Sequence, residues 1–249
     1  MRLIFHQLTG IGDRLSNQDF MAHFVTDDYA MFVVADGLGG HLSGEKASRY
    51  FCEGVIGCAP RFIADLRSQP ETTLARWMDA ALDAMIQAFA GDHTANDAHT
   101  TCAVLYLDDS QVLTAHCGDT RIYRLDEQGK MWRTKDHSQT QKLLDEGKIT
   151  ERDMGQHPEQ HQLTRSLNVL KPYQPEIARH IPPQTGETFL LCTDGFWEQT
   201  KPQEFIALAK AGVNREALLK QAQLAYLRAE GRSDNLTVQW VRILEAGGR

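Results

Sequence analysis

Hydrophobic positions along the chain follow two spacings, one typical of strands and one typical of helices. Short apolar runs rich in β-branched and aromatic residues predict strands, and the clearest run covers residues 29–35. Apolar residues that recur every three or four positions predict helices at residues 43–58 and 71–90. Pro60 follows the first of these segments, so we expect the helix to be interrupted there.

The order of the predicted elements indicates how they pack. Besides the elements above, we predict strands at 2–8, 19–26, 100–107, 111–117, 121–125, 130–134, 177–181, 187–193 and 236–244, and helices at 202–211 and 215–229. Short connections between strands favour antiparallel pairing. The apolar face of each sheet must be buried against another sheet or against helices. We therefore expect an α+β fold: a four-layer α/β/β/α sandwich, with two antiparallel sheets flanked by helix pairs.

Residues 136–172 differ in character from the rest of the chain. This segment is polar and contains three of the ten histidines, among them His137 and His161. Only one short helix is predicted within it, at residues 138–146. We expect a single domain over residues 1–249, in which residues 136–172 form a surface flap.

Charge and composition exclude several classes of protein. The 249 residues carry a net charge of −7, with 26 basic and 33 acidic side chains. This balance disfavours nucleic-acid binding, and with it a metal-dependent nuclease, because affinity for a phosphate backbone comes mainly from Lys and Arg.

The apolar segments and the cysteines bear on where the protein acts. A helix that crosses a bilayer needs about 20 consecutive apolar residues, and no segment of this sequence approaches that length. The five cysteines form no CxxC pair, which is typical of buried thiols in a reducing compartment, and we expect a cytoplasmic protein.

Acidic residues recur at the ends of the predicted strands. The five are Asp19, Asp36, Asp119, Asp194 and Asp234. Taken alone, Asp36 is better explained as a capping residue and Asp119 as a turn former. Several carboxylates at one end of the sheets would repel one another unless cations bridged them. Carboxylate oxygens are the ligands that Mg²⁺ and Mn²⁺ prefer, whereas the His/Cys spacing of a zinc site is missing.

An arginine lies close to the first of these acids in the sequence. Arg14 stands five residues before Asp19 in a loop of turn-forming residues. A guanidinium beside divalent cations indicates recognition of an anion with several oxygens, such as a phosphoryl group. The residues therefore favour phosphoester hydrolysis. We interpret Arg121 as a structural, salt-bridged arginine and Glu198 as a helix-end charge.

Six sequence blocks in a fixed order support this interpretation. They cover residues 12–19, 34–45, 100–101 with 118–121, 135–138 with 163–167, 191–198, and 233–237. Together they resemble the metal-dependent protein phosphatases, the type 2C serine/threonine phosphatase family, in its compact bacterial form. The resemblance covers nearly the whole chain. Because one motif alone is weak, the ordered context carries the assignment.

The resemblance implies a metal centre of Mn²⁺ or Mg²⁺. It implies that Asp36 bridges two ions, that Asp194 and Asp234 complete one of them, and that the Gly37 carbonyl binds the other. Asp19 would hold that second ion through water.

The resemblance also assigns roles at the edge of this centre and in the reaction. It implies that Arg14 binds the substrate phosphate and that Asp119 helps to hold a third, weaker ion. A hydroxide shared by the two core ions would attack phosphorus. The implied substrates are phosphoserine and phosphothreonine on proteins, in opposition to a bacterial Ser/Thr kinase, with a secretion-system kinase as one candidate.

Two positions depart from the family pattern. Gln18 stands where the family usually has Glu, and Leu38 stands where animal members have His, so the donor of the leaving-group proton is unassigned. Two alternatives stay open: a non-catalytic phosphoprotein-binding module on the same fold, and a phosphatase for small phosphoesters. Gln18 is the only support for the first alternative, and the second would use the same residues.

Overall fold

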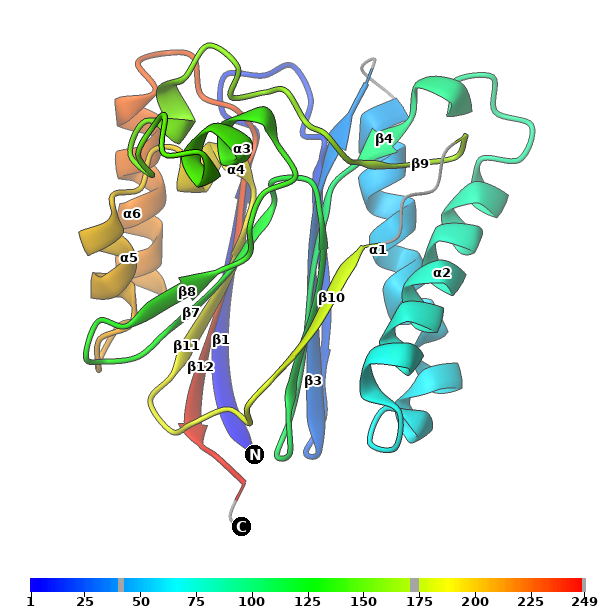
Figure 1. Cartoon of the computed structure of the whole chain (residues 1–249), viewed down its shortest axis with the longest axis vertical. Helices are drawn as coiled ribbons and strands as arrows, with labels where there is room; N and C mark the ends of the chain where they lie inside the picture. Colours follow the sequence, from blue (N-terminus) through cyan, green and yellow to red (C-terminus); the bar gives the residue numbers. More distant parts are fainter. Residues whose placement is uncertain (40–42, 171–174, 248–249) are drawn as a thin grey trace.

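Two β-sheets pack face to face, and helices cover the outer face of each (Figure 1). The computed structural model describes residues 1–39, 43–170 and 175–247. The four-layer α/β/β/α arrangement predicted from the sequence is confirmed. Residues 40–42 of the glycine-rich block and residues 171–172 of the predicted flap lie outside the described residues.

The first sheet is antiparallel and joins the two ends of the chain. Its strand order is β1-β12-β11-β7-β8. The bounds are β1 Arg2–Gly10, β7 Arg121–Leu125, β8 Met131–Arg133, β11 Thr188–Cys192 and β12 Leu236–Glu245. The first and last strands pair along their whole length, from Arg2 opposite Glu245 to Gly10 opposite Leu236.

The second sheet is built around the long strand β3 (Tyr29–Leu38), which pairs with β2, β4 and β5. Its order is β10-β6-β5-β3-β4-β9, with β2 paired to the same β3. The other bounds are β2 Asp19–Val25, β4 His99–Thr100, β5 Cys102–Asp108, β6 Val112–Cys117, β9 Leu167–Asn168 and β10 Glu176–His180. The strand β3 runs beyond the predicted end at residue 35, because Gly37 and Leu38 pair with β4. Asp36 therefore lies within a strand, not after one.

Six α-helices occur in the described residues, and one of them corrects a prediction. The bounds are α1 Ser43–Phe62, α2 Pro70–Ala88, α3 Gln139–Asp145, α4 Asp194–Trp197, α5 Pro202–Leu208 and α6 Arg215–Arg228; short 3-10 turns lie at Ile63–Asp65, Ala95–Asp97 and Met154–Gln156. The expected interruption at Pro60 is wrong, since α1 continues to Phe62. Pro60 removes one hydrogen bond near the helix end, and the buried Ala59 and Phe62 hold the last turn in place.

The alternation of side chains along β3 divides the core into layers. Phe32 and Val34 face the other sheet, where they pack in a cluster with Phe189 and Val241. Met31, Val33 and Ala35 point the opposite way, into the cluster under α1 and α2. A third cluster fills the space between the first sheet and α5 and α6. The period of two in a strand produces this division, because successive side chains leave opposite faces.

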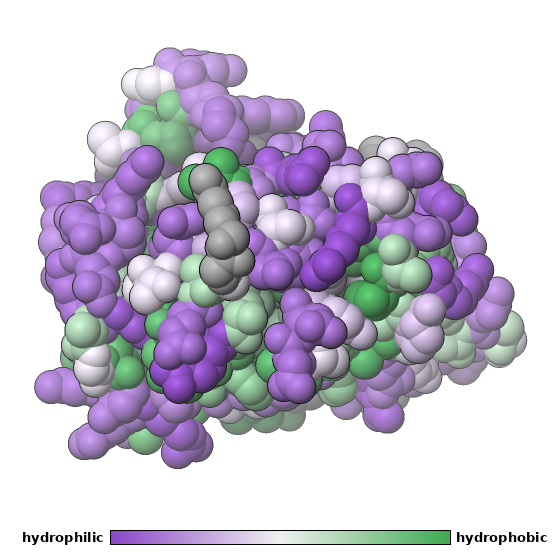
Figure 2. All heavy atoms as spheres, turned by 90° about the horizontal axis from the view of Figure 1, so that it is seen from below, coloured by the Kyte–Doolittle hydropathy of each residue, from purple (hydrophilic) through white to green (hydrophobic). Residues whose placement is uncertain are grey.

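The remaining sequence expectations concern thiols and surface. Four cysteines are buried, Cys58 is partly buried, and all five are free thiols. In the described part of the chain, no helix is long and apolar enough to cross a membrane. Figure 2 shows the end of the molecule that carries the chain termini, where hydrophilic residues surround several small hydrophobic groups.

Candidate metal centre

The five predicted aspartates come from both sheets and act on one another electrostatically. Asp19 on β2 lies directly opposite Asp36 on β3. The charges of Asp19, Asp119 and Asp234 act on Asp36, and those of Asp36, Asp119 and Asp234 act on Asp194. The structure therefore brings all five predicted carboxylates together.

Threonines hold the backbone of Asp36 in place. The N–H of Asp36 donates to Oγ1 of Thr101 at 2.9 Å, and the Asp36 carbonyl accepts from the N–H of Thr101 at 2.8 Å. Oγ1 of Thr100 donates to the same carbonyl at 3.0 Å. Thr101 also bonds Thr120 beside Asp119, at 2.6 Å. The threonine pair in the sequence block thus fixes the backbone of Asp36 and links it to the turn that carries Asp119, without using either carboxylate.

Gly37 is required by the close approach of helix α1. A Cβ added at Gly37 would lie 2.1 Å from the carbonyl oxygen of Gly44 and 2.7 Å from that of Gln18. Any side chain here would push the start of α1 away from β3. The N–H of Gly37 donates to the Gln18 carbonyl at 3.0 Å, which ties the strand to the preceding loop.

A loop at the start of the chain is fastened to residues near its end. Nδ2 of Asn235 donates to the carbonyls of Ile11 and Ser16, and its Oδ1 accepts from the N–H of Gln18 at 2.7 Å. Within this loop, Nη2 of Arg14 lies 2.5 Å from Oδ2 of Asp234. Arg14, proposed from the sequence as a phosphate ligand, is therefore placed directly at the acid cluster.

The electrostatics of the cluster show an excess of negative charge. Burial, with the charge of Asp234, raises the pKa of Asp19 to about 7, although Thr193 donates a hydrogen bond to its Oδ2 at 2.8 Å. Burial and the neighbouring Asp136 raise the pKa of Asp119 to about 7. Burial and the surrounding carboxylates hold the pKa values of Asp36 and Asp194 well above their usual range.

This arrangement fits divalent cations. Oδ1 of Asp19 is buried without a hydrogen-bond partner in the described structure. Burial lowers the pKa of Arg14, but the carboxylates of Asp234, Asp194 and Asp36 outweigh that effect and raise it. One guanidinium does not balance five carboxylates. Hard oxygen donors that crowd together in this way suit Mg²⁺ or Mn²⁺.

Glu198 also belongs to this neighbourhood, which our interpretation of it as a helix-end charge missed. Burial, then the charges of Asp119 and Asp234, raise its pKa to about 8. A signal was present in the sequence: Glu198 follows Asp194 by four residues, which places both on one side of a helical turn.

Arg121 has the structural role expected from the sequence. Its guanidinium is buried and pairs with Asp136, with Nη2 2.6 Å from Oδ2. The same group lies over the ring of Trp197, 3.4 Å from its centroid. Nε1 of Trp197 donates to the carbonyl of Asp119 at 2.9 Å, so this stack supports the turn that carries Asp119.

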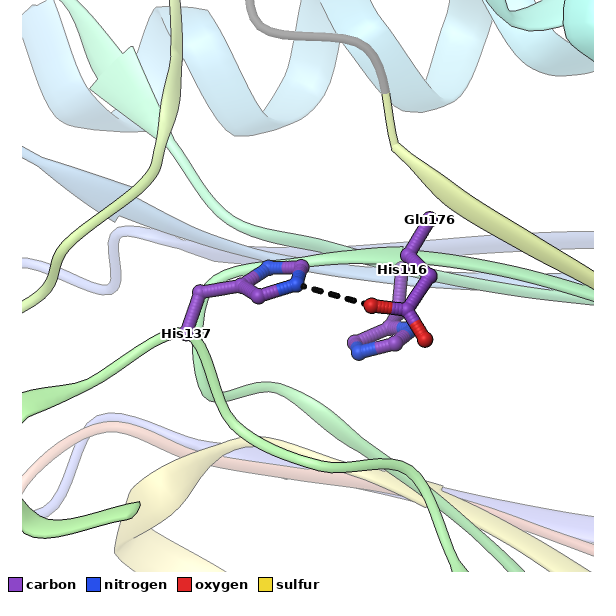
Figure 3. A group of neighbouring side chains, drawn as sticks. All are labelled: His116, His137 and Glu176. Carbon is purple, nitrogen blue, oxygen red and sulfur yellow. Dashed lines mark hydrogen bonds and ion pairs between the residues drawn. The ribbon is translucent and has the colours of Figure 1, made fainter. Parts of the chain in front are cut away.

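A second group of potential ligands lies apart from the aspartates (Figure 3). The rings of His116 and His137 stack with centroids 4.8 Å apart and 9° between their planes. Nδ1 of His137 accepts from the N–H of Gly118 at 3.2 Å, and its Nε2 faces Glu176 at 3.4 Å. Nε2 of His116 donates to the carbonyl of Lys135 at 2.8 Å.

These contacts favour an anchor over a metal site. Both ring nitrogens of His137 already have partners, and the lone pairs of the two stacked rings lie in nearly parallel planes, so they do not converge on one point. The backbone of His137 adds two more bonds, from its N–H to the Gly118 carbonyl and from the N–H of Thr164 to its own carbonyl, each 2.8 Å. His137 thus ties the flap to the turn before Asp119.

Comparison with known proteins identifies the class. Residues 9–229 match the sequence profile of the family Protein phosphatase 2C, so the chain belongs to that family. The resemblance noted in the sequence is therefore confirmed.

Two relatives and one solved structure illustrate the extent of the similarity. The chain is 30% identical over 227 residues to the serine/threonine phosphatase stp of Listeria monocytogenes, covering 90% of this chain and 88% of that one. It is 28% identical over 249 residues to the protein phosphatase PhpP of Streptococcus pneumoniae, covering 96% of each. The structure of the serine/threonine phosphatase PstP/Ppp of Mycobacterium tuberculosis superposes with a TM-score of 0.81 at 25% identity, over 98% of this chain and 99% of that one.

Proposed function

We propose that this protein is a metal-dependent protein serine/threonine phosphatase that removes phosphate from phosphoserine and phosphothreonine side chains of other proteins. The observation that carries the proposal is the convergence of five carboxylates, three buried and two partly buried, and of Arg14 in a chain of the protein phosphatase 2C family. The named relatives are serine/threonine phosphatases, which supports the same substrate class.

The chain's own residues would hold the metal ions. Asp36 is central in the cluster and would contact two ions, one of them shared with Asp194 and Asp234. Asp19 and the carbonyl of Gly37 would serve the other, and Asp119 a third. Bound Mn²⁺ or Mg²⁺ supplies a nucleophile from water at neutral pH and neutralises charge on the phosphoryl group.

Arg14 would bind and orient the phosphoryl group. Its guanidinium offers parallel N–H donors that match two phosphoryl oxygens. In the present structure it is paired with Asp234, so a bound phosphoryl group would take over part of that interaction. Leu38 carries no ionisable proton, so a different group must protonate the leaving alcohol.

The decisive experiment measures phosphate release from a phosphothreonine peptide. The wild type and Asp36→Asn are compared with Mn²⁺, with Mg²⁺ and with EDTA. We expect metal-dependent activity that falls by about a thousandfold or more in the variant, because the loss of one shared carboxylate removes several kcal/mol of electrostatic stabilisation. Asp27→Asn is the matched control, since Asp27 is an exposed acid in the turn that precedes β3.

The other outcomes separate the alternatives. A folded, metal-loaded wild type without turnover on several phosphopeptides would favour the non-catalytic binding module. Turnover confined to small phosphoesters would favour the small-molecule phosphatase. Either result would overturn the proposed substrate class.

The proposal extends to the pathway and the place of action. The structure of PppA, described as a key regulatory component of the T6SS in Pseudomonas aeruginosa, matches with a TM-score of 0.73 at 25% identity. This likeness supports a role in the cytoplasm opposite a bacterial Ser/Thr kinase, with a secretion-system kinase as the first candidate. Loss of phosphate from an autophosphorylated kinase of the same cell, on addition of this enzyme, would support that role; retention of the phosphate would contradict it.

A further inference from the structure

The face of β3 that carries Asp36 continues to a place opposite a histidine. Pairing along β3 keeps one register, from Val34 opposite Ala103 to Leu38 opposite His99. Residues directly opposite each other in an antiparallel pair point to the same face, and so do residues two apart along one strand. Val34 packs toward the other sheet. His99 therefore leaves its strand on the same face as Asp36, one row of side chains further on.

We propose that Nε2 of His99 donates a hydrogen bond to the oxygen that leaves phosphorus when phosphoserine or phosphothreonine is hydrolysed. The inference rests on the phosphatase function proposed above. Negative charge builds up on that oxygen as its bond to phosphorus breaks, and a fixed N–H donor stabilises charge that develops in the transition state. Leu38, directly opposite His99, offers no donor. The ring contributes a hydrogen bond only, and no proton leaves it.

Two neighbours on β9 fix which ring nitrogen can donate. Nδ1 of His99 lies 3.0 Å from Oγ of Ser166 and 3.4 Å from the amide nitrogen of Asn168. The N–H of Leu170 donates to Oδ1 of Asn168 at 2.8 Å, so the amide of Asn168 turns its NH₂ group toward the ring. Nδ1 of His99 therefore accepts, and the hydrogen of the neutral imidazole lies on Nε2.

The donor nitrogen is left for a substrate. In the part of the chain that the structure describes, no protein group forms a hydrogen bond with Nε2 of His99, and the side chain is partly exposed. Figure 1 shows β4, which carries His99, beside the end of β3 where Asp36 lies. Arg14 reaches the cluster through Asp234 at the start of β12, in the other sheet. The two donors thus come from different sheets, and one can hold phosphoryl oxygens while the other serves the leaving oxygen.

The buried flap histidine is a weaker candidate for this role. Nδ1 of His137 accepts from the N–H of Gly118, and its Nε2 faces Glu176. Both of its ring nitrogens are therefore occupied, whereas only one is occupied in His99.

The consequence is a rate that depends on the leaving group. The alkoxide of serine or threonine is a strong base, so its departure gains from a hydrogen-bond donor. Nitrophenolate is a weak base that leaves without such help. The contribution of His99 should therefore be large for a phosphothreonine peptide and small for p-nitrophenyl phosphate.

The test uses two substitutions that each keep one half of the ring's function. The amide of His99→Asn reaches the place of Nδ1 and keeps the contact with Ser166, but it has no donor at Nε2. His99→Gln is one methylene longer and brings an N–H near the place of Nε2. The values of kcat and KM are measured for the full chain with saturating Mn²⁺, on a phosphothreonine peptide and on p-nitrophenyl phosphate. His93→Asn, at an exposed histidine, is the matched control.

The expected result is a loss of kcat on the peptide alone. We expect His99→Asn to lower kcat on the peptide by about a hundredfold and His99→Gln by about tenfold or less. Neither should change kcat on p-nitrophenyl phosphate by more than about threefold, and His93→Asn should match the wild type on both substrates.

A purely structural role would give the opposite order of the two variants, because His99→Asn keeps the contact with Ser166 and His99→Gln does not. Full peptide activity in His99→Asn, or equal losses on both substrates, would overturn this inference and leave the proposed phosphatase untouched. A wild type that turns over no phosphopeptide would overturn the proposed function and this inference with it.

Discussion

At the scale of single residues, Gln18 marks where this chain departs from its family. Its amide lies 3.4 Å from the Gly39 carbonyl, beside the acid cluster, and its backbone is held by Asn235. We predict that Gln18→Glu tightens Mn²⁺ binding several-fold, because affinity for hard cations rises with the charge of the ligand set. Calorimetric titration measures the change. Gln87→Glu adds the same charge on the exposed face of α2 and should leave the affinity unchanged; equal effects of both substitutions would contradict the prediction.

His137 is expected to stabilise the fold through its ring. His137→Ala leaves the buried N–H of Gly118 without its acceptor and removes the stack on His116. We predict a loss of about 1–3 kcal/mol in the free energy of unfolding, measured by urea denaturation. Glu176→Gln keeps an oxygen that can accept from Nε2 of His137, so its effect should be small. A stable His137→Ala variant would show that the anchor carries little energy.

The residues of the site differ in how readily the sequence reveals them. Asp36, Asp194 and Asp234 were predictable because each stands next to an apolar strand, and that pattern is local. The pairing of Arg14 with Asp234 joins opposite ends of the chain and follows from no local rule. His161 approaches Asp194 only because the flap folds back over α4. Such placements depend on tertiary packing, which single-chain periodicity does not encode.

At the scale of elements, the contact between α1 and α2 depends on one glycine. A Cβ at Gly54 would lie 2.8 Å from the Ala81 carbonyl, whereas a Cβ at Gly57, one turn further on, would meet nothing within 4 Å. We predict that Gly54→Ala destabilises the protein by about 1–3 kcal/mol, because the helices must separate. Gly57→Ala should stabilise it by up to about 1 kcal/mol, since alanine favours the helix. Urea denaturation of both variants gives the comparison, and shifts of the same sign would contradict it.

The ends of helices and strands also show where tertiary packing outweighs the local sequence pattern. Helical periodicity placed α2 and α6 within about two residues of their observed bounds, an error typical of such boundaries. It failed at the end of α1, where the burial of Ala59 and Phe62 outweighs the effect of Pro60. It also ended β3 too early, because the pairing of Gly37 with Thr100 is non-local.

At the scale of the whole molecule, the crowded carboxylates couple stability to pH and to metal. The pKa values of Asp19 and Asp119 are raised to about 7 and that of Glu198 to about 8, all by burial first. The folded protein therefore keeps protons that the unfolded chain has already lost. We predict that in EDTA the melting temperature falls as pH rises from about 6.5 to about 8.

Saturating Mn²⁺ should reverse this behaviour. Cations replace the protons, so stability should rise by about 2.7 kcal/mol at a free metal concentration of 100 times Kd, and the fall with pH should disappear. Calorimetric melting curves at several pH values, with EDTA and with Mn²⁺, check both statements. Histidines with lowered pKa, such as His137, act in the opposite direction below about pH 6.5, which is why the comparison starts there. A flat curve in EDTA would contradict the prediction.

The pairing of β1 with β12 has a consequence for when the enzyme becomes active during its synthesis. Arg14 and the loop around it leave the ribosome well before Asp234, Asn235 and the strand that completes the first sheet, because 220 positions separate Arg14 from Asp234. Until then β1 has no partner on its only paired side, and the acid cluster lacks a member. A nascent chain that stops before Asp234 therefore carries most of the site's residues but an incomplete acid cluster, so dephosphorylation should begin only after β12 has left the ribosome.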